Sequence, residues 1–465
     1  MKKALSNEKI SCFALVLLIT GAIDSIRNLP GTALFGTSLI FFFIFSALLF
    51  LIPVALVSAE LSSAWSQDEG GIYSWVQHAF GPNWAFLAIW LQWINTMVWY
   101  PTILSFIAGA LAYLIDPALV DHKFFLLPVI IISFWALTFL GLTGIRISAT
   151  FASFCTLVGM IFPMLLMIIL AIIWLATGKP LAIHFTWTNL LPDWSNSQSW
   201  ISLTAIMTSF LGMELAAVHV RNVHQPQKNF PRAMLFSTLL IMSTMILGSL
   251  AIAFVLSKEQ ISLVGGVMQA FENFFAVYHL QAIMPVMVIL LLIGSLGGMV
   301  NWIISPAKGL LLAADHGFLP NWLRATNKHG VASNILWMQA ILVTLLCGTF
   351  LLLPSINAIY WFFQDLSTEL YMLMYVMMFC AACQLKRKYP QKESAFQIPG
   401  GSTVYYLVCI LGLIGCALTL VIGFIPPDTS IGIINAYHIY FTAGMILMII
   451  PTSFFYQYKR QNNRR

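Results

Sequence analysis

The stretch that decides the fold is residues 200–233, WISLTAIMTSFLGMELAAVHVRNVHQPQKNFPRA. It begins as an apolar span, yet Gly212 is followed two residues later by the carboxylate of Glu214. A glycine destabilises a helix by about 1 kcal/mol relative to alanine, and a charge near the bilayer centre costs roughly 2.5–3.5 kcal/mol. Because the chain accepts both within three residues, the pattern predicts an interrupted helix whose freed backbone groups hold a ligand inside the membrane.

The composition is typical of an integral membrane protein. Of the 465 residues, 60% are hydrophobic and only 8% are charged, whereas soluble domains contain about 25% charged residues. Apolar runs of about 20 residues, the length needed to cross a bilayer, recur along the whole chain. We therefore predict an all-α integral membrane protein with about twelve transmembrane helices. These spans lie near residues 10–35, 38–66, 84–115, 124–143, 146–177, 200–221, 232–257, 281–313, 333–354, 357–385, 403–425 and 435–458.

The distribution of basic residues predicts the orientation. Residues 1–10 are polar and run into the first span without a signal-peptide cleavage site, so we expect them to be retained. With a cytoplasmic N-terminus, all 22 Lys and Arg residues except Arg27, Lys123, Lys179 and Lys258 fall in inside segments. This asymmetry favours a multi-pass protein of the cell (inner or plasma) membrane with both termini cytoplasmic. The net charge of +6 is then explained by topology, and we do not expect nucleic-acid binding.

The first span contains a second predicted interruption. Two glycines, a proline and two opposite charges lie within eleven residues, at Gly21, Asp24, Arg27, Pro30 and Gly31. Proline removes a backbone donor and disfavours helix in the residue before it, so the segment IDSIRNLP is expected to be non-helical or strongly kinked. The alternative is a simple proline kink with a structural ion pair between Asp24 and Arg27 at helical i,i+3 spacing.

The two interrupted spans carry their carboxylates at mirrored depths. At 1.5 Å per residue, Glu214 and Asp24 each lie about 20 Å from the start of their span, counted from opposite faces of the membrane. An inverted repeat of spans one to five and six to ten predicts this relation, and paired interrupted spans point to a transporter's binding site. We therefore divide the chain into a transport core, residues 1–385, and two additional C-terminal spans, residues 386–465.

Two other spans carry notable side chains. The tenth holds Asp365 and Glu369 one helical turn apart; either could titrate during transport, and Glu369 is the favoured candidate because Asp365 could instead mark the start of the helix. The third is rich in aromatic residues, which at helical spacing are more often packing or membrane-interface residues than ligand contacts. They are Trp90, Trp93, Trp99 and Tyr100.

Four motifs resemble those of a known family. AELSSAW…GGIYSWVQHAFG resembles the segment after the second span in the amino acid–polyamine–organocation superfamily, and GMELAAVHVRNVHQPQKNFPRA is similar to its sixth-span signature. IRNLPGTALFG, and LYMLMYVMMF followed by a basic stretch and FQIPGG, resemble its glutamate:γ-aminobutyrate antiporter branch. The resemblance covers nearly the whole chain. It departs at Gln225, where asparagine is usual, and at Asp24, where that branch more often has an uncharged residue.

The resemblance implies a leucine-transporter-like fold, a 5+5 inverted repeat with broken spans 1 and 6 that works by alternating access. It implies that free amides of the first break hold the substrate α-carboxylate and that carbonyls of the sixth break hold the α-ammonium. Helix dipoles favour the same assignment. The substrate-binding candidates are Ile23, Asp24, Ser25, Ile26, Phe210, Gly212, Met213 and Glu214.

The predicted function is secondary active transport of amino acids or related amines by exchange, with proton symport as the alternative. Asp24, Arg27, Glu214 and Glu369 are the coupling candidates, since buried carboxylates can bind protons near neutral pH. His219 could tune Glu214 or simply pack. Asp24 and Glu214 disfavour an anionic side chain unless one of them is protonated or pairs with Arg27. A neutral or weakly cationic substrate is therefore expected.

Other classes of protein fit less well. An intramembrane enzyme would need a nucleophile–base or metal constellation, and the sequence contains no H-E-x-x-H and no compact His/Asp/Glu set, so we expect neither catalysis nor a metal or other cofactor. A channel would need a symmetric polar filter. A sodium-coupled member of the same fold would need extra oxygen ligands near Gly21 and Ala22 and on the eighth span, where Ser295 and Asn301 are modest candidates. A non-transporting receptor remains an alternative.

Overall fold

The computed structural model describes residues 11–65, 71–144, 149–193, 195, 197–214, 223–297, 299–351, 355–392, 394, 396–426 and 434–462. Within these residues the chain is helical and contains no β-strand, which confirms the predicted all-α class. The helices of the first half are α1 (Cys12–Ile23), α2 (Leu29–Ala33), α3 (Leu39–Ser46), α4 (Ile52–Ala64), α5 (Ile72–Phe80), α6 (Pro82–Ile115), α7 (Lys123–Leu142), α8 (Ala149–Thr156), α9 (Phe162–Ala176), α10 (Trp187–Leu190) and α11 (Ile201–Ser209). Those of the second half are α13 (Pro226–Val255), α14 (Gly266–Val277), α15 (Met284–Gly297), α16 (Met299–Leu311), α17 (Ser333–Cys347), α18 (Ile356–Lys388), α19 (Gly401–Ile422), α20 (Ile434–Ile449) and α21 (Pro451–Asn462).

The membrane-length helices follow the predicted spans closely. In the described part of the chain, eleven helical stretches are long and apolar enough to cross a membrane, and each coincides with one predicted span. The predicted span that is missing from this set is residues 200–221. Its helix, α11, is only nine residues long, and residues 215–222 lie outside the described part. The one predicted span without a membrane-length helix in the described residues is therefore the span that was expected to be interrupted.

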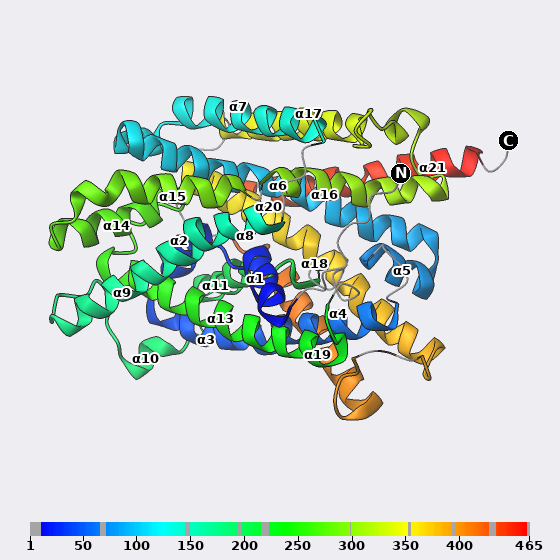
Figure 1. Cartoon of the computed structure of the whole chain (residues 1–465), viewed down its shortest axis with the longest axis horizontal. Helices are drawn as coiled ribbons and strands as arrows, with labels where there is room; N and C mark the ends of the chain where they lie inside the picture. Colours follow the sequence, from blue (N-terminus) through cyan, green and yellow to red (C-terminus); the bar gives the residue numbers. More distant parts are fainter. Residues whose placement is uncertain are drawn as a thin grey trace.

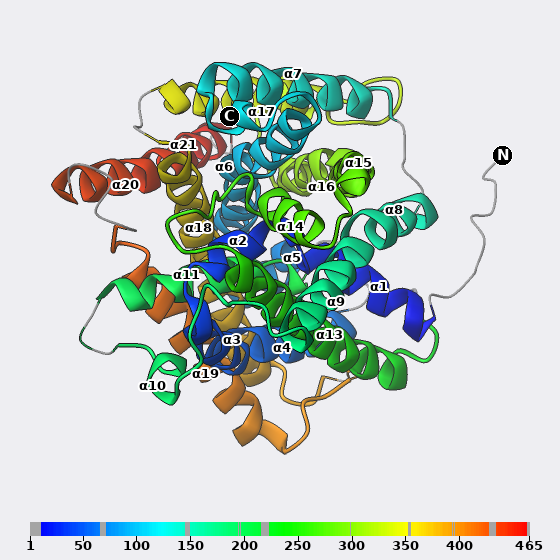
Figure 2. The same ribbon diagram turned by 90° about the vertical axis from the view of Figure 1, so that its left-hand side faces the viewer.

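The long helices pack around two central ones. Helices α6 and α18 contact each other and run through the middle of the molecule (Figure 1). In both views α7 and α17 lie side by side along one edge, and α3, α4 and α19 lie on the opposite side (Figures 1 and 2). Helices α10 and α14 follow Lys179 and Lys258 in the loops that the predicted topology puts outside, and both lie at one end of the molecule (Figure 1). Helix α5, between the second and third spans on the predicted inside, lies at the other end.

The first span is broken at the expected place. Helix α1 ends at Ile23, and both Asp24 (φ −64°, ψ 134°) and Ser25 (φ −150°, ψ 111°) are extended. The chain then re-enters a helix through a 3₁₀ turn and α2, whose first turn contains Pro30. Proline suits this position because the first backbone amides of a helix have no helical partner. The interruption predicted within IDSIRNLP is confirmed.

The sixth span is broken by a different device. Helix α11 ends at Ser209, and Gly212 has φ +102°, in the left-handed region that favours glycine. The backbone amide of Gly212 donates to the hydroxyl of Tyr375 on α18 (2.9 Å), so a side chain replaces the lost helical hydrogen bond. The predicted break at Gly212 is also confirmed.

Candidate functional site

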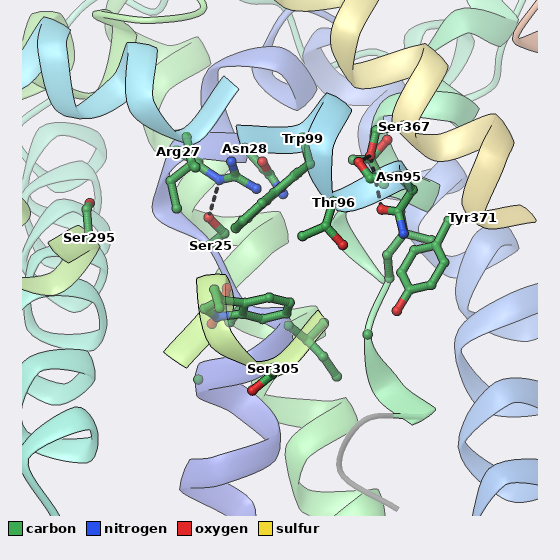
Figure 3. Close-up of a pocket in the computed structure, with 18 of the residues that line it drawn as sticks. Ser25, Arg27, Asn28, Asn95, Thr96, Trp99, Ser295, Ser305, Ser367 and Tyr371 are labelled. Atoms are coloured by element: carbon green, nitrogen blue, oxygen red, sulfur yellow. Dashed lines mark hydrogen bonds between the residues drawn. The ribbon is translucent and has the colours of Figure 1, made fainter. Parts of the chain in front are cut away.

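The two breaks open onto one cavity. Its volume is about 240 Å³, and its walls come from the first break, α6, the α8–α9 helix, the sixth break, α15, α16 and α18. A single water needs about 10–15 Å³ on this scale, so the cavity has room for a small organic molecule. The polar lining residues are Asp24, Ser25, Arg27, Asn28, Gln92, Asn95, Thr96, Thr156, Thr208, Ser295, Ser305, Ser367 and Tyr371, most of which appear in Figure 3.

The structure brings most, though not all, of the sequence candidates to this cavity. Those that line it are Ile23, Asp24, Ser25, Ile26, Arg27 and Gly212. Phe210, Met213, Glu214 and Glu369 are buried but are not among its lining residues. Phe210 packs edge-on against Phe43, with ring centroids 5.8 Å apart. His219, the proposed partner of Glu214, lies outside the described residues.

Asp24 presents one carboxylate oxygen without a hydrogen-bond partner in the described part of the chain. Its side chain is 3% exposed, and Oδ2 accepts a hydrogen bond from the hydroxyl of Thr244 on α13 (2.7 Å). Oδ1 is buried and has no hydrogen-bond partner among the described residues. Since buried polar atoms are normally satisfied, this oxygen is available to a donor that enters the cavity.

Arg27 is held away from Asp24. Its Nε donates to the Ser25 hydroxyl (3.1 Å), its Nη1 donates to the Thr102 hydroxyl (3.2 Å), and its guanidinium lies 4.5 Å from the ring centre of Trp99. Figure 3 shows Arg27 beside Trp99 at the cavity wall. In the described structure no ion pair joins Arg27 to Asp24. The extended backbone at Asp24 and Ser25 removes the helical i,i+3 proximity, so the alternative of a structural Asp24–Arg27 pair in a kinked helix is wrong.

Glu214 lies one layer behind the cavity wall. It is 2% exposed, and the hydroxyls of Tyr371 and Tyr375 donate to its Oε1 and Oε2; the amide of Gln92 adds a longer contact to Oε1 (3.4 Å). Tyr371 itself lines the cavity. The Tyr371 hydroxyl and the Gln92 amide, both from cavity-lining residues, therefore connect the buried carboxylate to the cavity, and a change in the protonation of Glu214 would alter hydrogen bonds at the cavity wall.

Sequence reasoning missed much of the polar wall. On α6, Gln92, Asn95, Thr96 and Trp99 all line the cavity, and the backbone carbonyl and side-chain oxygen of Asn95 both accept from the hydroxyl of Ser367 on α18 (3.3 Å each). The four α6 residues are spaced i, i+3, i+4, i+7, which is one face of a helix. That spacing of polar residues in an apolar span was the available signal.

The aromatic residues of the third span divide into two groups. Trp90 and Tyr100 are buried, and each donates to a backbone carbonyl (2.9 Å and 2.7 Å), as expected for packing residues. Trp93 and Trp99 line the cavity. Two of the four aromatic residues therefore lie at the cavity, and the other two pack away from it.

Metal binding finds no support in the described residues. They contain no group of three or more His, Cys, Asp or Glu side chains that could hold a metal ion. Ser295, one of the two candidate sodium ligands on the eighth span, lines the cavity, and its hydroxyl donates to the Leu291 carbonyl (2.9 Å). The side chain of the other candidate, Asn301, lies outside the described part.

The fold and cavity agree with a comparison against known families, in which the sequence model described as "Amino acid permease" matches residues 10–451. The chain belongs to the amino acid permease family. The permease is 41% identical, over 97% of both chains, to an uncharacterised transporter of Legionella pneumophila. It is 28% identical to a glutamate/γ-aminobutyrate antiporter of Lactococcus lactis, over 96% of this chain and 88% of that protein. It is 24% identical to a probable agmatine/putrescine antiporter of Lactococcus lactis, over 90% of this chain and 89% of that protein.

A solved structure gives the same fold at low sequence identity. The manganese transporter of Eremococcus coleocola, crystallised with an aromatic bis-isothiourea compound, superposes with a TM-score of 0.58 at 13% identity, covering 97% of this chain and 94% of that one. Family and fold together make the permease a multi-pass membrane transporter with a small-molecule substrate, as the sequence motifs predicted.

Proposed function

We propose that this permease exchanges amino acids or related amines across the cell membrane by alternating access, and that the substrate binds in the cavity between the two helix breaks. The observation that carries the proposal is that both interruptions, 187 residues apart from Ser25 to Gly212, border one cavity. Two relatives that cover most of the chain are an antiporter for glutamate and γ-aminobutyrate and a probable antiporter for agmatine and putrescine. These names favour exchange over symport.

The backbone at the breaks suits a zwitterion. The first break presents the N-terminal end of the 3₁₀ turn Ile26–Asn28, where the first amides lack helical partners and the dipole favours an anion. The sixth break presents the C-terminal end of α11, where the helix dipole favours a cation. A substrate carboxylate is thus proposed to bind near Ser25 and Ile26, and an ammonium near Phe210 and Gly212.

The charges around the cavity limit the rest of the substrate. Asp24 and Arg27 both line it, so the lining charges cancel, and the carboxylate of Glu214 is shielded by Tyr371. An additional negative charge on the substrate would have to share Arg27, which already donates to two hydroxyls. We therefore propose a substrate with a neutral or weakly cationic side chain.

Counterflow in proteoliposomes tests the proposal. Purified permease is reconstituted with or without an internal amino acid or amine, and uptake of a labelled panel is followed with and without a pH gradient. The proposal requires uptake that depends on an internal partner, with neutral or weakly cationic compounds preferred. Uptake driven by the pH gradient alone would instead establish proton symport. Selective uptake of glutamate, unaffected by neutral amino acids, would overturn the proposed substrate charge.

Glu214 is the proposed proton-coupling residue, because Tyr371 connects it to the cavity. Glu214→Gln keeps the size of the side chain but cannot bind a proton. We expect this variant to be expressed normally and to transport with a flattened pH profile. An unchanged pH profile would remove Glu214 from the coupling role.

The division of the chain and its orientation are further parts of the proposal. Every cavity-lining residue lies between Gly21 and Tyr371, which supports a transport core of residues 1–385 followed by two accessory spans. The placement of α10 and α14 at one end, with α5 at the other, fits an orientation with both termini in the cytoplasm. Single cysteines placed in α10 and after α5 are labelled in intact cells with reagents that do or do not cross the membrane, and the pattern of labelling tests the orientation.

A further inference from the structure

Helix α18 has a second polar face, turned away from the cavity. Asp365 and Glu369 are one helical turn apart, and Ser367, which lines the cavity, is two residues from each, about 200° around the helix. The hydroxyl of Tyr437 on α20 donates to Asp365 Oδ2 (3.2 Å). Gly423, directly after α19, touches Glu369: a Cβ added at this glycine would lie 1.9 Å from Oε1. The two carboxyls therefore face the C-terminal spans.

Within the described residues, neither carboxyl has the partners that a negative charge requires. Asp365 is 1% exposed and Glu369 is 0% exposed. Oδ1 of Asp365 and both carboxyl oxygens of Glu369 have no hydrogen-bond partner among the described residues. An isolated carboxylate in an apolar environment is strongly destabilised, and two of them within one turn also repel each other. Glu214, by contrast, has three donors.

The groups around the pair cannot neutralise it. Over the described residues, the titratable side chains that face it are Tyr437 from α20 and Cys416 from α19, and neither supplies a positive charge. In the same residues no ion pair links Asp365 or Glu369 to a lysine, arginine or histidine. Neutrality in this arrangement must come from something bound to the carboxyls.

The packing distinguishes a proton from a metal ion. Ca²⁺ takes six to eight oxygen ligands at about 2.3–2.6 Å, and Mg²⁺ needs a near-ideal octahedron. Glu369 packs against Gly423, and the described residues contain no group of three or more His, Cys, Asp or Glu side chains that could hold a metal ion. A proton needs no coordination shell and no space beyond that of the carboxyl itself.

We infer that Asp365 and Glu369 form a proton-binding site, separate from the substrate cavity, that is closed by Gly423 and Tyr437 of the two C-terminal spans. In the packed state both carboxyls carry a proton. Release of a proton leaves a charge that the packed state cannot stabilise, so release requires the α19–α20 pair to move off α18. The site lies about 14–20 Å along α18 from Ile356, where this helix begins.

Infrared spectroscopy of the full-length protein in proteoliposomes tests the site, because a protonated carboxyl has its own carbonyl stretching band. At pH 7 we expect Asp365→Asn and Glu369→Gln each to reduce the area of this band, and the double variant to reduce it by the sum. Glu272→Gln, an exposed carboxylate on α14, is the matched control and should leave the band unchanged. A band that is the same in wild type, both single variants and the double variant would overturn the inference.

Hydrogen exchange supplies a second readout that a merely structural role would not move. After correction for the intrinsic pH dependence of exchange, we expect protection of the amides in residues 413–426 and 437–449 to fall in the wild type as pH rises. The Asp365→Asn/Glu369→Gln variant should keep its protection, because the side-chain amides that replace the two carboxyls stay neutral at every pH. An equal pH response in both proteins would contradict the role of the pair. Neither measurement depends on the substrate or on exchange, so failure here leaves the proposed function intact.

Discussion

The two helix breaks border the same cavity but are built differently. The first uses extended non-glycine residues, and its carboxylate, Asp24, lines the cavity with one oxygen unpartnered. The second depends on the left-handed backbone of Gly212, and its carboxylate, Glu214, is surrounded by donors behind Tyr371. This difference suggests different roles for the two breaks. We propose that the first break offers charge to the ligand directly, whereas the second offers backbone groups and responds to protonation of Glu214 through a hydroxyl.

The largest expected effect is on the backbone of the second break. Gly212→Val places a β-branched side chain at φ +102°, a conformation that costs on the order of 1–3 kcal/mol for an ordinary residue. We expect lower thermal stability and a loss of counterflow of about five- to 150-fold, since 1.36 kcal/mol is tenfold. Gly348→Ala is the control, because no atom lies within 4 Å of the added Cβ. Wild-type transport by Gly212→Val would show that the second break does not need this backbone.

The hydroxyl of Tyr375 joins the backbone and the carboxylate of the second break. Tyr375→Phe leaves the Gly212 amide and Glu214 Oε2 each without this partner. An unsatisfied buried group costs about 1–3 kcal/mol, so we expect transport to fall by about tenfold or more and the melting temperature to drop. The exposed Tyr440 gives a matched control in Tyr440→Phe. If both variants behave alike, Tyr375 does not couple the two groups.

At the first break, Arg27→Lys keeps the charge but loses the planar fork that contacts Ser25, Thr102 and Trp99. Stacking of a cation on an aromatic ring is worth about 0.5–2 kcal/mol. We expect the KM for exchange to rise several-fold with little change in the pH profile, in contrast to Glu214→Gln. A flattened pH profile in Arg27→Lys would contradict the assignment of the pH response to the second break alone.

The smallest effect on transport is expected at Thr244, which donates to Asp24 from α13. Thr244→Val removes one hydrogen bond to a carboxylate while keeping the shape of the side chain. Such hydrogen bonds contribute about 1.5–3 kcal/mol, which is the upper limit of the expected loss in the free energy of unfolding. A substrate that donates to Asp24 would recover part of this loss. The expected result is a modest drop in melting temperature that is smaller with bound substrate, measured by thermal unfolding with and without the preferred compound.

The architecture could be predicted from the sequence because the patterns that determine it are local, and departures from them cost free energy. Apolar runs set the spans, and glycine, proline and charge within them located both breaks at Asp24 and Gly212. It could not place side chains that depend on helix rotation. Nothing local shows that Glu214 lies behind Tyr371, or that Glu369 faces Gly423 and not the cavity.

The polar wall of α6 combines features that the sequence can predict with one that it cannot. Gln92, Asn95, Thr96 and Trp99 are spaced on one helical face, so the sequence contained the signal for them. Their partner Ser367 comes from α18, 272 residues away in sequence from Asn95, and a single sequence holds no information on that pairing.

The position of bound substrate tests the central claim most directly. Counterflow identifies the preferred compound, and a cryo-electron microscopy structure of the permease in its presence then locates it. We predict that the ligand lies in the cavity and contacts both breaks, with its carboxylate near Ile26 and its ammonium near Gly212. A ligand that is bound elsewhere, or that contacts only one break, would contradict the account.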